Sequence, residues 1–233
     1  MALLKPDGTP YEFEGHLGNG TNSIVFQRGP YALKVPKIRD LAGLSGEELA
    51  DTQYLNSMNR KILDREKAVY RRIGTCEAIA ECVQISDEGI LLPCFSQGDL
   101  ESYIRERKEV AQPRKVTWIL SAIKAVHHLH HTAKVLVFDI APRNFLLTDD
   151  MSLKMIDFGQ AALFPLDTDI TTASDDGLTV QVDIFHLGCT IYSIASWKLY
   201  ECNLMDYNYK LPRLEDLPNV DDCFCGEIIK NAG

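Results

Sequence analysis

Apolar residues recur at helical spacing between residues 45 and 73, which predicts a helical segment with one buried face. The apolar positions of this pattern are Leu55, Met58, Ile62, Val69, Tyr70 and Ile73. Ser45 and Glu48 have the spacing of a capping box, and Gly74 follows the last apolar position, so the segment should begin and end there. One extended helix or two shorter helices fit this stretch equally well.

Glu66 lies on the apolar stripe of this segment, between Ile62 and Val69. A carboxylate in such a place is costly to bury unless a cation meets it. We expect that cation to be Lys34 from a facing sheet. The alternative is that Glu66 lies at the edge of the stripe and pairs with Arg65 or Arg71 in solvent.

Residues 25–34 read as two strands joined by a tight turn at Arg28-Gly29, because glycine suits the positive φ that such turns need. A turn at this place predicts that Val25 pairs opposite Ala32. Period-two alternation then puts Lys34 on the same face as Ala32.

Two short apolar runs, residues 145–147 and 153–156, flank a polar turn and predict a β-hairpin. If the turn closes symmetrically, Asn144 and Asp157 lie opposite each other at its open end. Directly paired side chains come within about 5 Å. An oxygen pair of this kind suits Mg²⁺ that is bound together with substrate phosphates.

Further elements follow from the same patterns. A buried strand should end at Leu92, and helices should open at Asp99-Leu100 and span residues 116–131. Residues 183–194 are apolar nearly all round, which predicts a buried helix with Asp183 as its N-cap residue. The four histidines near residue 130 invite a metal site, but a solvated helix end, where a charged histidine favours the dipole, explains them better.

Composition narrows the functional class. The net charge of −9 argues against nucleic acid or an anionic membrane as partner. Seven cysteines at irregular spacing argue against a secreted disulfide framework. No stretch approaches the roughly 20 apolar residues of a membrane span. We therefore expect an intracellular protein, cytoplasmic or nuclear.

Residues 137–144, Val-Phe-Asp-Ile-Ala-Pro-Arg-Asn, followed by Asp157-Phe158-Gly159, resemble the catalytic loop and magnesium loop of protein kinases. The resemblance implies one bilobal α+β domain over residues 1–233, with a small antiparallel-sheet lobe and a larger, mostly helical lobe. The expected boundaries are an N-lobe at 11–92, a hinge at 93–98 and a C-lobe at 99–233 that closes early.

The resemblance also implies a role for each site residue in moving the γ-phosphoryl group of ATP to a protein Ser, Thr or Tyr hydroxyl, with Mg²⁺. Asp139 would accept the proton of the attacking hydroxyl, and Arg143 would supply a cation near the γ-phosphate. Lys34 would hold phosphates with Glu66 orienting it, and Asn144 and Asp157 would bind Mg²⁺. The resemblance further implies that Asp183 bonds the catalytic-loop backbone. The remaining nucleotide-binding positions that it implies are Gly18, Asn19, Gly20, Val25, Ala32, Leu92 (the gatekeeper), Cys94 and Phe95 (adenine-edge donors) and Leu146.

Three departures from the family pattern limit the resemblance. Val137 and Phe138 replace a histidine and an arginine, so an activation segment would lack its usual phosphate partner. Ala141 stands where lysine is usual, and the short stretch from Asp157 to Asp183 contains no Ala-Pro-Glu. Two alternatives therefore stay open: a pseudokinase or scaffold without transfer, and a small-molecule kinase.

Overall fold

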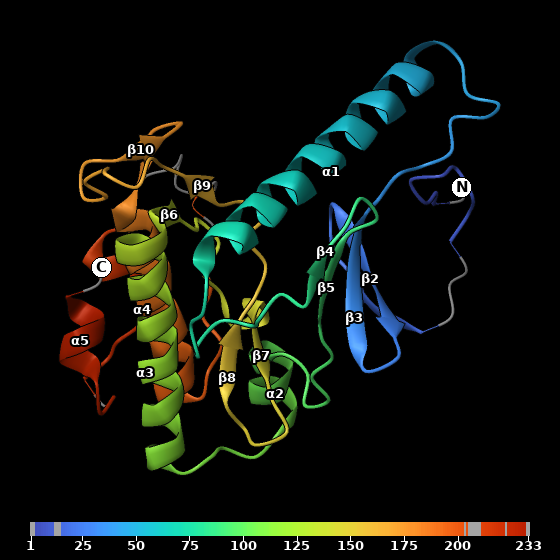
Figure 1. Cartoon of the computed structure of the whole chain (residues 1–233). Helices are drawn as coiled ribbons and strands as arrows, with labels where there is room; N and C mark the ends of the chain where they lie inside the picture. The colour runs from blue at the N-terminus through green and yellow to red at the C-terminus, as the bar shows by residue number, and fades with distance from the viewer. Residues whose placement is uncertain (1–2, 12–14, 203, 205–210, 222, 232–233) are drawn as a thin grey trace. The chain divides into compact units, whose positions relative to one another are not determined.

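A computed structural model describes residues 3–11, 15–202, 204, 211–221 and 223–231. The chain divides into a smaller unit, residues 1–72 and 80–94, and a larger unit, residues 73–79 and 95–233. An antiparallel sheet and one long helix form the smaller unit, and helices dominate the larger one (Figure 1). The α+β class predicted from the sequence is confirmed, whereas the predicted lobe and hinge boundaries stay a prediction.

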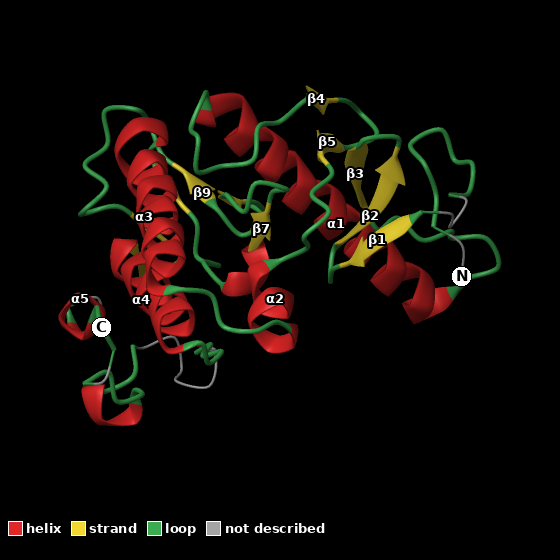
Figure 2. Cartoon of the chain, turned by 90° about the horizontal axis from the view of Figure 1, so that it is seen from below, coloured by secondary structure: helices red, strands yellow, loops and turns green. Residues whose placement is uncertain are grey.

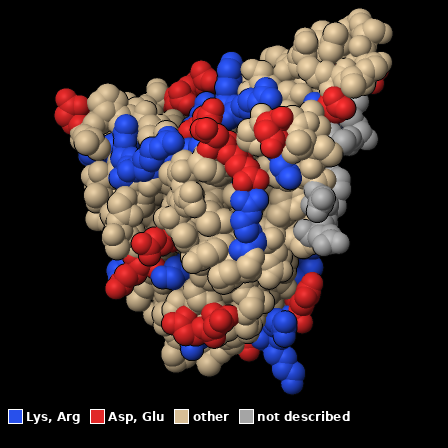
Figure 3. Space-filling view, turned by 45° about the vertical axis from the view of Figure 1, so that its right-hand side comes forward, with Lys and Arg blue, Asp and Glu red and all other residues tan. Residues whose placement is uncertain are grey.

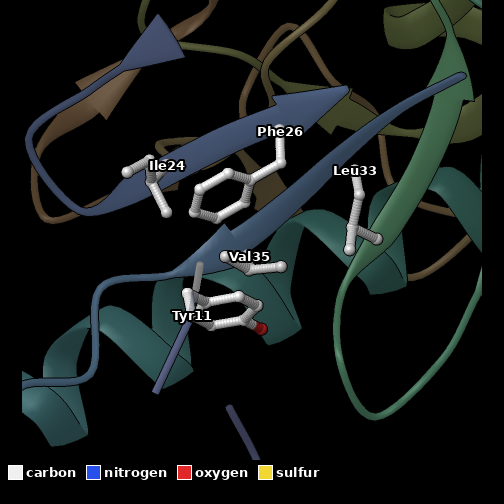
Figure 4. Packing of buried hydrophobic residues seen from close by; sticks show 5 residues of the cluster. All are labelled: Tyr11, Ile24, Phe26, Leu33 and Val35. Atoms are coloured by element: carbon white, nitrogen blue, oxygen red, sulfur yellow. The ribbon is translucent and has the colours of Figure 1, made fainter. Parts of the chain in front are cut away.

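The sheet of the smaller unit has the order β1-β2-β3-β5-β4 with antiparallel pairing throughout. Its strands are β1 His16–Asn19, β2 Ser23–Arg28, β3 Tyr31–Pro36, β4 Gln84–Ile85 and β5 Ile90–Pro93. One face carries a buried apolar cluster in which the Tyr11 ring stacks on Phe26, with ring centroids 5.1 Å apart (Figure 4). That face is therefore the core of this unit, and the opposite face carries Lys34.

The register between β2 and β3 differs from the prediction. Val25 lies opposite Lys34, and Ala32 lies opposite Gln27, so the expected pairing of Val25 with Ala32 is wrong. The reason is the turn, which is centred on Gly29-Pro30: Gly29 takes φ +61 at the first turn position. Proline has no N–H for the ladder and prefers a turn, so the strands close one residue later.

Helix α1 is one continuous helix of 28 residues, Gly46–Ile73, that ends before Gly74 at φ +65 (Figure 1). Acidic residues in its first turn and basic residues in its last turn complement the helix dipole. Its buried residues are Thr52, Asn56, Asn59, Leu63, Glu66, Lys67, Val69, Tyr70 and Ile73. Leu55, predicted to be on the stripe, is 43% exposed, so the prediction is wrong for this residue, whereas Met58 and Ile62 are half-buried. The fully buried residues in the first half of the helix are polar.

In the larger unit, α3 and α4 pack side by side (Figures 1 and 2). The helices are α2 Leu100–Glu106, α3 Gln112–His128 with a π-helical turn Leu129–Ala133, α4 Val180–Ser196 and α5 Gly226–Lys230, with 3₁₀ turns at Pro142–Asn144 and Leu214–Asp216. The strand pairs are β6 Val135–Leu136 with β9 Ala162–Leu163, β7 Phe145–Leu147 with β8 Leu153–Met155, and β10 Ser174–Asp175 with β11 Leu178–Thr179. On the face shown in Figure 3, acidic and basic side chains are interspersed.

Candidate active site

In the smaller unit, β3 and α1 bring Lys34 and Glu66 together. The Lys34 Nζ lies 2.8 Å from the Glu66 Oε2, and the two side chains are 10% and 1% exposed. Glu66 is thus fully buried, so the alternative in which it pairs with Arg65 or Arg71 in solvent is wrong. A buried ion pair of this kind holds the ammonium group in one place on the sheet.

Residues 18–23, which we call the glycine-rich turn, include the end of β1, where Gly18 lies opposite Val25 and Asn19 opposite Ile24. Gly18 and Gly20 both lie outside the positive-φ region. A Cβ added at either glycine would meet the surrounding atoms no closer than 3.6 Å, an ordinary contact distance. Neither the backbone conformation nor the described packing therefore requires glycine at these two positions.

Three of the predicted adenine-binding side chains share the sheet face that carries Lys34. Val25 on β2 lies opposite Lys34 on β3, and Ala32 on β3 lies opposite Leu92 on β5. Ala32 and Lys34 are two residues apart on β3 and so project from the same face, as do residues that lie opposite each other on neighbouring strands. The Cys94 N–H donates to the Pro30 carbonyl at 3.1 Å. This N–H is thus used within the protein, and the adenine-edge donors Cys94 and Phe95 stay a prediction.

The hairpin β7–β8 of the larger unit forms as predicted, but its register differs by one residue. The Ile156 N–H donates to the Asn144 carbonyl at 2.9 Å, so Asn144 faces Ile156 and not Asp157. The five-residue turn closes between Thr148 and Ser152, which fixes this register. Leu146 lies opposite Lys154 within the hairpin.

Asp139 is held by two neighbours on the same loop. Arg143 Nη2 lies 2.5 Å from one carboxylate oxygen, and the Asn144 amide nitrogen donates to the other at 3.0 Å. The same amide nitrogen donates to the Asp139 carbonyl at 2.8 Å, and Arg143 Nη1 lies 2.6 Å from Glu201 Oε1. With its side chain 34% exposed, the Asp139 carboxylate is both oriented and open to a reactant.

The donor set of this loop fits a hard cation. Because the Asn144 nitrogen is spent on Asp139, its amide oxygen is the atom left for a metal ion. Asp157 adopts φ +65, a strained conformation for a residue with a side chain, and one of its carboxylate oxygens accepts from the Gly159 N–H at 3.2 Å. Oxygen donors of this kind suit Mg²⁺. Among the described residues, no three His, Cys, Asp or Glu side chains gather around a common metal position.

Asp183 supports the catalytic loop from α4. The predicted role as N-cap is wrong, because α4 begins at Val180 with Thr179 in the cap position. The bond to the catalytic-loop backbone that the resemblance implies is confirmed: the fully buried Asp183 carboxylate accepts from the Val137 N–H at 2.8 Å and the Phe138 N–H at 2.7 Å. These two hydrogen bonds hold Phe138, which has φ +62, immediately before Asp139.

Sequence reasoning missed two histidines that act within the fold. His130 is buried, and its Nε2 lies 2.7 Å from the Asp183 carboxylate, while the His128 Nε2 lies 2.7 Å from the Ile73 carbonyl. The expected solvated helix end is therefore wrong for these two and holds for the exposed His127 and His131. The signal was the spacing: His130 lies four residues after the buried Val126.

The segment after Asp157 packs on the catalytic loop through apolar contacts. Phe138, at the position where the family carries arginine, contacts a buried cluster that includes Ile170 and Ala173. This segment is consequently held by apolar packing at the place where a phosphate and an arginine would otherwise pair.

The model of the protein kinase domain matches residues 11–211, most of the chain. The chain belongs to the protein kinase domain family. It is 27% identical over 169 residues to the serine/threonine-protein kinase crk1 of Schizosaccharomyces pombe, covering 68% of this chain and 46% of that protein. It is 25% identical over 219 residues to the serine/threonine-protein kinase cds1 of the same yeast, covering 82% and 45%.

A third relative of this kinase domain is the probable serine/threonine-protein kinase KIN28 homolog of Encephalitozoon cuniculi, 30% identical over 169 residues, with 64% of this chain and 51% of that protein covered. The chain thus spans about half the length of these curated relatives. Protein kinases use ATP and Mg²⁺. None of the helices among the described residues is both long and apolar enough to cross a membrane.

Proposed function

We propose that this kinase domain transfers the γ-phosphoryl group of ATP, with Mg²⁺, to a Ser, Thr or Tyr hydroxyl of a protein. The observation that carries the proposal is that Arg143 and Asn144 bind the Asp139 carboxylate and orient it, while its side chain stays partly exposed to a reactant. A carboxylate that is oriented but not enclosed suits a general base for an incoming hydroxyl.

The smaller unit would bind the nucleotide. Lys34, held by Glu66, would contact phosphates, and the face shared by Val25, Ala32 and Leu92 offers apolar contacts for adenine. The backbone conformation and the packing at positions 18 and 20 would both tolerate a residue with a side chain. Glycine at both positions is accounted for if a ligand approaches the backbone closely there.

The larger unit would carry the chemistry. Asp139 would take the proton of the attacking hydroxyl while the hydroxyl oxygen bonds to the γ-phosphorus. The bond between the γ-phosphorus and the oxygen that bridges it to the β-phosphate breaks, and ADP leaves with that oxygen. Asn144 and Asp157 would hold Mg²⁺, which supplies neutralisation of the phosphate charge when bound. Arg143 would keep Asp139 oriented and add positive charge near the transferred group.

We also infer an intracellular site of action, cytoplasmic or nuclear. Seven cysteines stand at irregular spacing, and no disulfide joins any of them among the described residues, a pattern that is typical of a reducing compartment. The expectation that nucleic acid and membranes are not partners stays a prediction.

The test is transfer of labelled γ-phosphate from Mg-ATP to a panel of proteins, peptides and small hydroxyl compounds. The wild type should label a protein or peptide in a Mg²⁺-dependent manner, and Asp157→Asn should remove the labelling. Asp167→Asn, the same change on an exposed turn, serves as the control. Labelling that survives Asp157→Asn would contradict the mechanism. Binding of Mg-ATP without transfer to any acceptor would favour a scaffold, and labelling of small hydroxyl compounds alone would favour a small-molecule kinase.

A further inference from the structure

Three residues outside the predicted catalytic set form a closed ring of hydrogen bonds at the glycine-rich turn, through the side chains of Asn22 and Asn59 and the backbone of Asn22 and Lys37. The Asn22 amide nitrogen donates to the Asn59 amide oxygen at 2.8 Å, and the Asn59 amide nitrogen donates to the Lys37 carbonyl at 2.8 Å. The Lys37 N–H donates to the Asn22 carbonyl at 2.9 Å, which closes the ring. We call Asn22, Lys37 and Asn59 the turn tether.

The Lys37 side chain makes a further hydrogen bond to the same turn. Its ammonium group donates to the Gly20 carbonyl oxygen. Burial, with a smaller contribution from Arg39, holds the Lys37 pKa below its ordinary value, as expected for a partly desolvated ammonium. The turn is thus held at Gly20 by the Lys37 ammonium and at Asn22 by the Asn59 amide.

The tether joins the turn to the helix that also carries Glu66. Asn59 precedes Glu66 by seven residues, which is two helical turns, so both project from the same face of α1 about 10 Å apart along its axis. Both side chains are buried, and both bond to segments of the sheet or its connections. One helix therefore positions the glycine-rich turn and the Lys34–Glu66 pair.

We propose that the turn tether is a positioning device that fixes the glycine-rich turn to α1, so that the turn and the Lys34–Glu66 pair meet the nucleotide phosphates as one preorganised body. The proposal rests on the proposed phosphotransferase function. A turn with two glycines is free to adopt many conformations, and ordering it in advance lowers the entropy lost on binding. Asn22, Lys37 and Asn59 would act through the turn and would not touch the nucleotide themselves.

The chain offers a matched control one helical turn earlier. Asn56 is also buried on α1, and its side chain makes a comparable pair of hydrogen bonds, accepting from the Arg39 N–H at 2.8 Å and donating to the Arg39 carbonyl at 2.9 Å. It clamps the connection between β3 and α1 without touching the glycine-rich turn. Asn56→Ala and Asn59→Ala should therefore cost similar stability, whereas only Asn59→Ala should release the turn.

The experiment has two arms. Amide hydrogen exchange of nucleotide-free protein should speed up over residues 18–23 in Asn59→Ala and stay at the wild-type rate there in Asn56→Ala. In the transfer assay, Asn59→Ala should raise the KM for Mg-ATP roughly 3- to 10-fold, the factor that corresponds to losing about one net hydrogen bond, with kcat little changed.

Equal exchange over residues 18–23 in the two variants would overturn the proposal, as would faster exchange with an unchanged KM. The exchange arm needs no nucleotide, so it decides whether the tether holds the turn even if the wild type proves unable to transfer phosphate. If Asn59→Ala does not fold, Lys37→Met, which removes only the ammonium contact with Gly20, is judged by the same two criteria.

Discussion

Replacing Glu66 by glutamine keeps the shape of the side chain but leaves the Lys34 ammonium buried without its carboxylate. At 2.8 Å and an effective dielectric constant of 20, the attraction between the two charges is about 6 kcal/mol, part of which desolvation cancels. Removing one partner of a buried pair costs about 3–5 kcal/mol, because the other charge stays buried. In a chain of this size, that loss corresponds to a decrease in Tm of roughly 6–20 °C.

Thermal unfolding of purified variants measures this effect. Glu88→Gln is the control, because Glu88 pairs with Arg28 at the surface, where an ion pair contributes about 0–1 kcal/mol. The double variant Lys34→Met/Glu66→Leu should recover part of the lost stability, since no charge remains buried. If Glu66→Gln lowers Tm no more than Glu88→Gln, the Lys34–Glu66 pair is not desolvated and the reasoning fails.

Three further outcomes are expected. Gly89→Ala should destabilise the smaller unit by about 1–3 kcal/mol in urea unfolding, because an added Cβ would overlap the Lys34 carbonyl oxygen; an unchanged midpoint would contradict this close approach. Burial holds the His186 pKa below its ordinary value of 6.5, so below that pH the unfolded chain binds a proton that the folded chain excludes. The contribution of His186 to stability is therefore fully present above pH 6.5 and is lost as the pH falls. The urea midpoint of the wild type should drop between about pH 7.5 and about pH 5.5, and His186→Gln should make this drop smaller. Phosphatase treatment should leave the transfer rate unchanged, since Phe138 packs against the apolar cluster that holds Ile170 and Ala173 of the following segment. A lower rate after treatment would show that a phosphate is needed.

Much of the site could be predicted because its signals are local. The helix end at Gly74 and the hairpin β7–β8 follow from short-range patterns of periodicity and turn residues. Glu66 was identifiable because a carboxylate on a buried stripe needs a cation, and Lys34 was the cation on the facing strand.

The missed features depend on partners that are distant in the sequence. Asn56 and Asn59 are polar and buried because backbone groups of the connection between β3 and α1 satisfy them, which periodicity does not reveal. Asp183 looks like a cap residue in the sequence, and only the family resemblance indicated that its carboxylate bonds to the backbone of Val137 and Phe138, more than forty residues earlier. The error in the β2–β3 register was avoidable, since Pro30 could not serve in the ladder.

The central claim is that Asp139 accepts the proton of the hydroxyl that attacks the γ-phosphate. The initial rate of γ-phosphate transfer from Mg-ATP to the identified acceptor tests it most directly, with Asp139→Asn compared with Asp150→Asn, the same change on the exposed hairpin turn. Asp139→Asn should lower the rate by at least about 100-fold, as loss of a general base does, while Asp150→Asn stays near the wild-type rate. Equal rates for the two variants would contradict the assignment of Asp139 as the catalytic base.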